Sequence, residues 1–168
     1  MIHVCSLARL HATVEETGAR HIITLINDET LVLRPECVAP EDHLFLGMHD
    51  ISIEMEGYRA PAEEHVHQLI EFVQRWHRRT PLVVHCFAGI SRSTAGAYIA
   101  ACALNPSRDE RTIALAIRQA SATAMPNLRL VSLGDRILGR NGRMVAAVEG
   151  IGRGLVSAEG HPFRLDLE

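Results

Sequence analysis

The sequence contains no lysine: all 17 of its basic residues are arginine, and 20 acidic residues bring the formal net charge to −3. Without lysine, Schiff-base chemistry and a lysine-based P-loop are excluded. A chain so close to neutrality also lacks the basic face through which nucleic-acid binders work. The binding of any anion must therefore fall to arginine side chains or to backbone amides.

Paired cysteines and long apolar runs are missing as well. The four cysteines, Cys5, Cys37, Cys86 and Cys102, form no Cys-x-x-Cys pair, which argues against a structural zinc site or a thioredoxin-like motif. The longest nearly uncharged run, residues 93–104, is too short to cross a bilayer, and we expect no signal peptide. We therefore expect no metal, no cofactor, no membrane or nucleic-acid partner, and a cytoplasmic protein with free thiols.

Strand-length apolar runs alternate with helical patterns in the first half of the chain. We predict strands over residues 2–7, 21–26, 43–48 and 82–84. We predict helices over residues 8–17, 62–77 and 93–104, the last apolar nearly all round and therefore central and buried. Two more helices follow, one starting at the capping-box pair Ser107 and Glu110 and one at Pro126–Asn127.

This order predicts an α/β fold: a single domain with a mainly parallel central sheet of four to five strands flanked by helices, and a helical C-terminal half. The length and the 47% hydrophobic fraction suit one packed core. We place the domain at residues 1–149. Residues 150–168, rich in glycine and poor in apolar groups, are expected to form a loosely structured tail. No pattern in the sequence indicates an oligomeric state.

The stretch from Pro81 to Thr94, PLVVHCFAGISRST, places Cys86 at the end of a buried strand and Arg92 at the start of a helix. Ligands of open α/β sheets bind at such strand-to-helix junctions. The amides of residues 87–92 should curl toward a common centre, to which the helix adds its positive end. Arg92 can bind two phosphate oxygens with its planar fork, and Gly89 permits a tight turn. The stretch therefore predicts an anion cradle that needs no lysine.

The same positive surroundings favour the thiolate form of Cys86. A thiolate that faces a bound phosphate is placed for in-line attack on phosphorus, so the residues predict phosphocysteine chemistry. A cysteine-protease interpretation fails, because His85 and Cys86 are neighbours on a strand and point to opposite faces. We assign His85 to the support of the loop backbone.

The motif His85-Cys86-x5-Arg92-Ser93 resembles the signature of the cysteine-based protein tyrosine phosphatase superfamily, and its wording is most similar to the compact dual-specificity-like branch. The resemblance implies that Cys86 is the nucleophile and that Ser93 donates to the thiolate when the phosphoenzyme is hydrolysed. It implies no metal. It also implies that phosphate is bound by the loop residues Phe87, Ala88, Gly89, Ile90, Ser91 and Arg92.

The family further implies a general acid on a loop ahead of the helix that precedes the signature. Asp50 is our choice, because it directly follows the predicted strand 43–48. Glu54 and Glu56 are rivals on the same loop, and Asp42 lies before the strand. Asn127 is expected to cap a helix, and it also resembles a family asparagine that lies near the signature loop.

The loop has no basic residue between Cys86 and Arg92, where Phe87 and Ile90 make it apolar, so a highly charged inositol headgroup is disfavoured. We predict a phosphatase that acts on phosphotyrosine in a phosphorylated protein or on a small aryl phosphate, with phosphoserine and phosphothreonine left open. The alternative is a phosphate-motif binding module with little turnover. Oxidation of Cys86 would add regulation, although no resolving cysteine is identifiable.

Overall fold

Within residues 1–167, the part of the chain that the computed structural model describes, five strands form one sheet in the order β3-β2-β4-β1-β5. The first four strands pair in parallel, and β5 pairs antiparallel with β1 at one edge. The strands are β1 (Ile2–Ser6), β2 (His21–Ile26), β3 (His43–Gly47), β4 (Leu82–Cys86) and β5 (Phe163–Leu165). The prediction of a mainly parallel sheet is confirmed.

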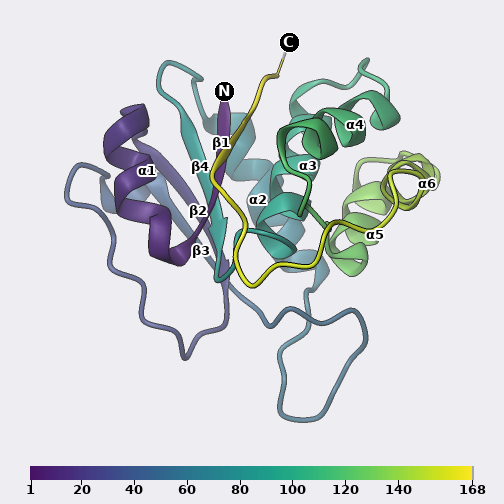
Figure 1. The fold of residues 1–168 in the computed structure, drawn as a ribbon, viewed down its shortest axis with the longest axis horizontal. Helices are drawn as coiled ribbons and strands as arrows, with labels where there is room; N and C mark the ends of the chain where they lie inside the picture. Colours follow the sequence, from purple (N-terminus) through teal and green to yellow (C-terminus); the bar gives the residue numbers. More distant parts are fainter. Residues whose placement is uncertain (168) are drawn as a thin grey trace.

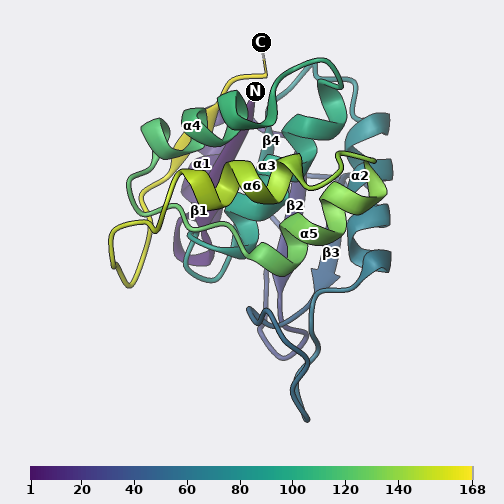
Figure 2. The same cartoon turned by 90° about the vertical axis from the view of Figure 1, so that its right-hand side faces the viewer.

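Six α-helices of the described residues cover both faces of this sheet (Figures 1 and 2). Helix α1 lies on one face, and the other five lie on the opposite face. The helices are α1 (Leu10–Thr17), α2 (Glu63–Arg75), α3 (Arg92–Leu104), α4 (Glu110–Ala120), α5 (Leu128–Ile137) and α6 (Arg143–Gly150). None of the helices in residues 1–167 is both long and apolar enough to cross a membrane.

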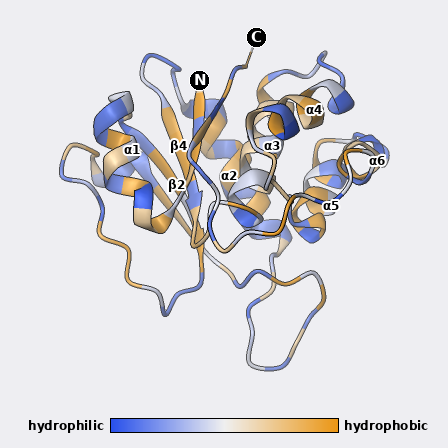
Figure 3. Cartoon of the chain, in the orientation of Figure 1, coloured by the Kyte–Doolittle hydropathy of each residue, from blue (hydrophilic) through white to orange (hydrophobic). Residues whose placement is uncertain are grey.

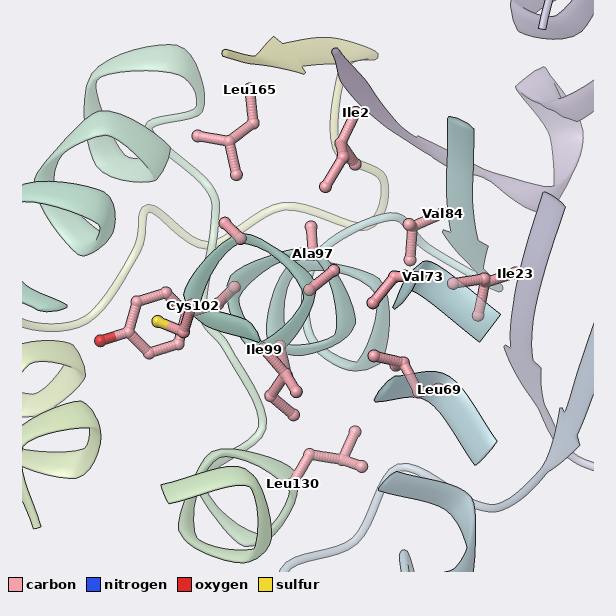
Figure 4. Packing of buried hydrophobic residues seen from close by; sticks show 14 of the residues in the cluster. Ile2, Ile23, Leu69, Val73, Val84, Ala97, Ile99, Cys102, Leu130 and Leu165 are labelled. Atoms are coloured by element: carbon pink, nitrogen blue, oxygen red, sulfur yellow. The ribbon is translucent and has the colours of Figure 1, made fainter. Parts of the chain in front are cut away.

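Helix α3 occupies the centre of the larger core, between the sheet and α5 (Figure 4). Its many alanines let neighbouring elements approach closely, and side chains such as Ile99 meet Leu69 of α2 and Leu130 of α5 around it. Apolar residues line the inner sides of the helices and the strands, whereas charged residues face outward (Figure 3). Helix α3 is buried along almost its whole length, as its all-round apolar sequence predicts.

Two local predictions are wrong. The capping box expected at Ser107 and Glu110 does not form, because Asp109 caps α4: its Oδ1 accepts a hydrogen bond of 2.8 Å from the amide of Thr112. The C-terminal residues, expected to be loosely structured, include β5, whose Phe163 and Leu165 are buried against the core. This strand has only three residues in which apolar and polar side chains alternate, which is too short a pattern to predict it from the sequence. It pairs with β1, whose outer edge is otherwise open.

The carboxyl ends of the four parallel strands all lie at the same end of the sheet, at the bottom of Figure 1. The connections that lie there include the loop from β4 to α3, the long loop from β3 to α2 that projects away from the body, and the segment that leads into α5. Functional groups of parallel α/β folds gather at this end.

Candidate active site

The loop between β4 and α3 turns around the thiol of Cys86, which is buried at the end of β4. The sulfur accepts a hydrogen bond of 3.3 Å from the amide of Gly89, and it lies 3.2 Å from the hydroxyl oxygen of Ser93. Gly89 has a φ of +73°, and a Cβ there would lie 2.7 Å from the backbone nitrogen of Ser6. Only glycine meets both requirements, the left-handed backbone and the close approach to β1.

The carbonyl groups of this loop are held outward by amides from other parts of the chain. Phe87 O accepts from Leu7 N at 3.1 Å, Ala88 O from Gly160 N at 2.9 Å, Ile90 O from Met125 N at 3.0 Å, and Ser91 O from Asn127 N at 3.2 Å. In a planar trans peptide the N–H points opposite to the C=O. The four outward carbonyls therefore turn the amides of residues 88, 89, 91 and 92 inward, toward the space above Cys86.

Arg92, the first residue of α3, brings a guanidinium to the same space and is only 7% exposed. Its Nη1 donates a hydrogen bond of 2.9 Å to the carbonyl of Met48, which orients the planar group. Its Nε is buried and has no hydrogen-bond partner. A buried charged donor without an acceptor is costly, so this N–H marks a place where a ligand oxygen can bind.

Behind Cys86, a chain of hydrogen bonds runs through β4, β2 and β3. His85 Nδ1 lies 3.3 Å from the carbonyl of Cys86, and His85 Nε2 lies 2.7 Å from the hydroxyl of Thr24. That hydroxyl is also 2.8 Å from His43 Nε2. Burial lowers the pKa of His85 to about 4 and also lowers the pKa of His43, so both rings are neutral at pH 7.

The direction of this chain follows from the carbonyl, which can only accept. Neutral His85 therefore carries its proton on Nδ1 and donates it to the carbonyl of Cys86. Its Nε2 must accept from the hydroxyl of Thr24, which in turn accepts from Nε2 of His43. The sequence indicates the support role of His85, but Thr24 and His43 carry no sequence signal, because their link to it is formed only by strand pairing.

Asp50 lies directly after β3, at the rim of the loop. Its Oδ1 accepts from the hydroxyl of Ser91 at 2.7 Å and from the side-chain amide of Asn127 at 2.9 Å. Asn127 also caps α5 as predicted, since its Oδ1 accepts from the amide of Leu130 at 3.0 Å. The same side chain therefore starts a helix and holds Asp50 beside the signature loop.

The other candidate carboxylates form ion pairs with other residues or make no hydrogen bond to the signature loop. Glu54 forms an ion pair of 3.0 Å with Arg129 on α5. Asp42 pairs with His21 at 3.3 Å, at the amino end of the strands and so at the opposite edge of the sheet from Cys86. Glu56 is exposed on the same loop as Asp50. Among these four carboxylates, the structure brings Asp50 into hydrogen-bond contact with the signature loop.

The other cysteines are not arranged around Cys86. Cys5 packs with the residues under α1, on the other face of the sheet, and burial raises its pKa to about 12. Cys102 is buried in α3, where burial likewise raises its pKa to about 12. Cys37 is exposed on the connection between β2 and β3. Across residues 1–167, no three His, Cys, Asp or Glu side chains gather as metal ligands would.

Comparison with known structures reveals the same fold in phosphatases and in a phosphatase-like protein. The chain superposes on DUSP15 with a TM-score of 0.63 at 18% identity, covering 89% of this chain and 90% of that one. It superposes on a human tyrosine phosphatase-like serine/threonine/tyrosine-interacting protein with a TM-score of 0.64 at 17% identity, covering 83% and 92%. The PTP-2 phosphatase of Cydia pomonella gives 0.62 at 16% identity, covering 79% and 82%.

No curated protein matches the chain in sequence. A family model does match it: the family described as "Polymorphic toxin system, DSP-PTPase phosphatase" aligns with residues 6–107. This match spans more than half of the chain and includes α1 to α3 with the whole signature loop. The chain thus belongs to this DSP-PTPase phosphatase family and, with it, to the compact dual-specificity-like branch of the cysteine-based protein tyrosine phosphatases.

Proposed function

We propose that this phosphatase hydrolyses phosphotyrosine monoesters through a phosphocysteine intermediate on Cys86. The observation that carries the proposal is the buried, unpartnered Nε of Arg92, which lies beside a loop whose amides turn inward around a cysteine sulfur. A tetrahedral dianion supplies oxygen acceptors for all of these donors at once. It also places its phosphorus in front of the sulfur.

In the first step, the thiolate of Cys86 attacks phosphorus in line with the leaving oxygen. The S–P bond forms while the P–O bond to the tyrosine side chain breaks. Asp50 gives its proton to the departing oxygen, and Arg92 with the loop amides binds the three remaining phosphoryl oxygens. The hydrogen bonds from Ser91 and Asn127 to Oδ1 of Asp50 leave its other oxygen free to carry this proton.

In the second step, water attacks the phosphocysteine and the S–P bond breaks. Asp50, now ionised, takes a proton from the water, and free phosphate leaves. The sulfur departs as a thiolate, which the Ser93 hydroxyl stabilises by donating a hydrogen bond across 3.2 Å. No residue of this scheme requires a metal ion.

The loop itself favours a monoester without further phosphate groups. No cationic side chain lies between Cys86 and Arg92, and Phe87, 62% exposed, presents an apolar ring beside the loop. An aryl ring gains from apolar contact of this kind, whereas an inositol headgroup with several phosphates gains nothing from it. Phosphotyrosine is therefore the preferred substrate, and phosphoserine and phosphothreonine are candidates to be compared with it.

The test is an aryl-phosphate assay in EDTA with the wild type, Cys86→Ser and Arg92→Ala. We expect wild-type turnover without metal, no turnover for Cys86→Ser, and a loss of about 100-fold or more for Arg92→Ala. Arg75→Ala, which removes an exposed arginine at the end of α2, is the matched control and should keep wild-type rates. Activity that survives Cys86→Ser, or that requires a divalent metal, would contradict the mechanism.

A second candidate function is a phosphotyrosine-binding module with little turnover. One of the similar structures is named a tyrosine phosphatase-like interacting protein, so this fold is also found in a protein described by its interactions. Tight binding of a phosphotyrosine peptide by the wild type, with release of inorganic phosphate no faster than in Cys86→Ser, would favour the module over the enzyme.

A further inference from the structure

The C-terminal segment runs along the outside of the phosphate-binding loop. Residues 152–162, which we call the strap, lead from the end of α6 past the N-terminal end of α3 to β5 (Figure 1, yellow). The family match ends at residue 107, so nothing in the family pattern assigns a role to this segment.

A hydrogen bond joins the strap to the loop at Gly160. The amide of this residue donates a hydrogen bond of 2.9 Å to the carbonyl of Ala88. A Cβ at Gly160 would lie 2.9 Å from the carbonyl oxygen of Gly89 and 3.3 Å from Cγ1 of Ile90. The φ of Gly160 lies outside the left-handed region, so the close approach, and not the backbone conformation, requires glycine there.

The strap is also fixed at two places that precede this contact in the chain. Before it, the amide of Leu155 donates 2.9 Å to the carbonyl of Ala122, and a Cβ on Gly154 would lie 2.6 Å from the carbonyl oxygen of Thr123. Next to it, the hydroxyl of Ser6 donates 2.5 Å to Oε1 of Glu159. Ser6 is paired with Cys86 in the sheet register, so this bond ties the strap to the strand beside the nucleophile.

We propose that the strap is a positioning element of the phosphate-binding loop, with the amide of Gly160 holding the Ala88–Gly89 peptide in its working orientation. The proposal rests on the proposed function. In this orientation the peptide points its N–H at the sulfur of Cys86 and its C=O at Gly160. A flip of the peptide would turn a carbonyl oxygen toward the bound phosphate.

Such a flip is easy at this place unless something opposes it. The peptide precedes Gly89, and glycine accepts both signs of φ at similar cost. The three other carbonyls held outward receive their hydrogen bonds from segments within or next to the core elements, namely Leu7, Met125 and Asn127. The Ala88 carbonyl depends on the strap, which makes the strap the determinant of one inward amide.

The test uses the full chain with Gly160→Ala and the matched control Gly150→Ala. Gly150 also has no left-handed φ, and a Cβ there meets no atom within 4 Å. The measurements are kcat and KM for an aryl phosphate, the inhibition constant of orthovanadate, and the midpoint of thermal unfolding. For Gly160→Ala we expect about ten-fold weaker vanadate inhibition and about ten-fold lower kcat/KM at a temperature where it is folded. Gly150→Ala should stay within about two-fold of the wild type.

A folded Gly160→Ala with the vanadate constant and kcat/KM of the wild type would overturn the proposal. If Gly160→Ala does not fold, a second pair of variants tests the proposal instead. Glu159→Gln keeps an oxygen that accepts from Ser6, whereas Glu159→Ala does not. We expect wild-type vanadate inhibition for Glu159→Gln and about three-fold weaker inhibition for Glu159→Ala. Equal constants for the two Glu159 variants and the wild type would then overturn the proposal.

Measurements on the wild type distinguish failure of the strap proposal from failure of the proposed function. A wild type that neither turns over aryl phosphate nor binds vanadate contradicts the phosphatase mechanism and the strap proposal together. An active wild type, with Gly160→Ala and Glu159→Ala equal to it, contradicts the strap proposal alone.

Discussion

At the scale of single residues, Asp50 shows how a side chain is assigned by its partners. An aspartate after a strand is commonly only a turn residue. Here two donors, the hydroxyl of Ser91 and the amide of Asn127, converge on one of its oxygens from two other elements. Ser91 belongs to the signature loop and Asn127 to the start of α5, so these two hydrogen bonds hold Asp50 at the rim of the site.

Asp50→Asn is expected to slow the cleavage of alkyl phosphates by about 100-fold, because their leaving oxygen needs a proton, and to slow aryl phosphates less. It should also flatten the alkaline side of the pH–rate profile, where the wild type loses its acid. The measurement is kcat against pH with one alkyl and one aryl substrate. Glu54→Gln and Glu56→Gln are the matched controls. A flattened profile in either control, with Asp50→Asn unchanged, would move the acid to that residue.

Thr24→Val removes the hydroxyl that donates to Nε2 of His85 and leaves this buried nitrogen without a partner. We expect a loss of about 1–3 kcal/mol in the free energy of unfolding and a lower kcat, because the His85 ring is no longer held against the carbonyl of Cys86. The measurements are urea unfolding and steady-state kinetics. Ile22→Val, in the same strand, controls for a small loss of packing. An unchanged kcat in a folded Thr24→Val would contradict the link to the site.

At the scale of elements, the position of α3 decides the position of Arg92, because the arginine that we propose binds phosphate is the first residue of that helix. Helix α3 is held by close contact on several sides. It packs on the sheet, on α2 and on α5. Because its side chains are small, the axis of α3 lies close to the axes of these neighbouring helices. Gly134 in α5 is one such contact, since a Cβ there would lie 2.7 Å from Cγ1 of Ile99.

Gly134→Ala should therefore lower the free energy of unfolding by about 1–3 kcal/mol, although alanine is the better helix former. The reason is that Ile99 or the α5 axis must move to admit the methyl group. The measurement is chemical unfolding of this variant next to Gly150→Ala. Gly150→Ala meets no neighbour, so it reports helix propensity without a clash. A Gly134→Ala variant as stable as Gly150→Ala would contradict the close packing of α3 and α5.

At the scale of the whole molecule, several buried or partly buried histidines have a lowered pKa. Burial lowers the pKa of His85 to about 4, and the charges of His43 and Arg92 act in the same direction. Burial also lowers the pKa values of His3, His43 and His65. Between the ordinary pKa of 6.5 and these lowered values, the unfolded chain binds protons that the folded chain does not, so stability falls as the pH falls.

We expect the free energy of unfolding to be nearly constant between about pH 7 and pH 8, below the ordinary pKa of the buried thiols, and to decrease as the pH is lowered toward 4. At pH 5, His85 alone accounts for a loss of about 2 kcal/mol. The measurement is urea unfolding at pH 7.5 and at pH 5.0. His85→Asn, which does not titrate, should show a smaller difference between the two pH values. A difference equal to that of the wild type would mean that His85 is not the main source of the dependence.

The sequence by itself determines which residues lie together at the centre of the candidate site. Cys86, Gly89 and Arg92 lie within one strand-to-helix junction, so their spacing alone specifies the loop, the nucleophile and the phosphate-binding arginine as predictions. The alternation of apolar runs likewise predicts the parallel sheet and the buried helix α3, because both depend on local patterns of hydrophobic residues.

Only the tertiary structure decides what surrounds that loop. Thr24, Glu159 and Gly160 come from segments far from it in the chain, and their hydrogen bonds and close approaches leave no periodic signal in the sequence. Strand β5 is three residues long and depends on the open edge of β1. These features arise when the sheet assembles, because the hydrogen bonds that define them join residues that only folding brings together.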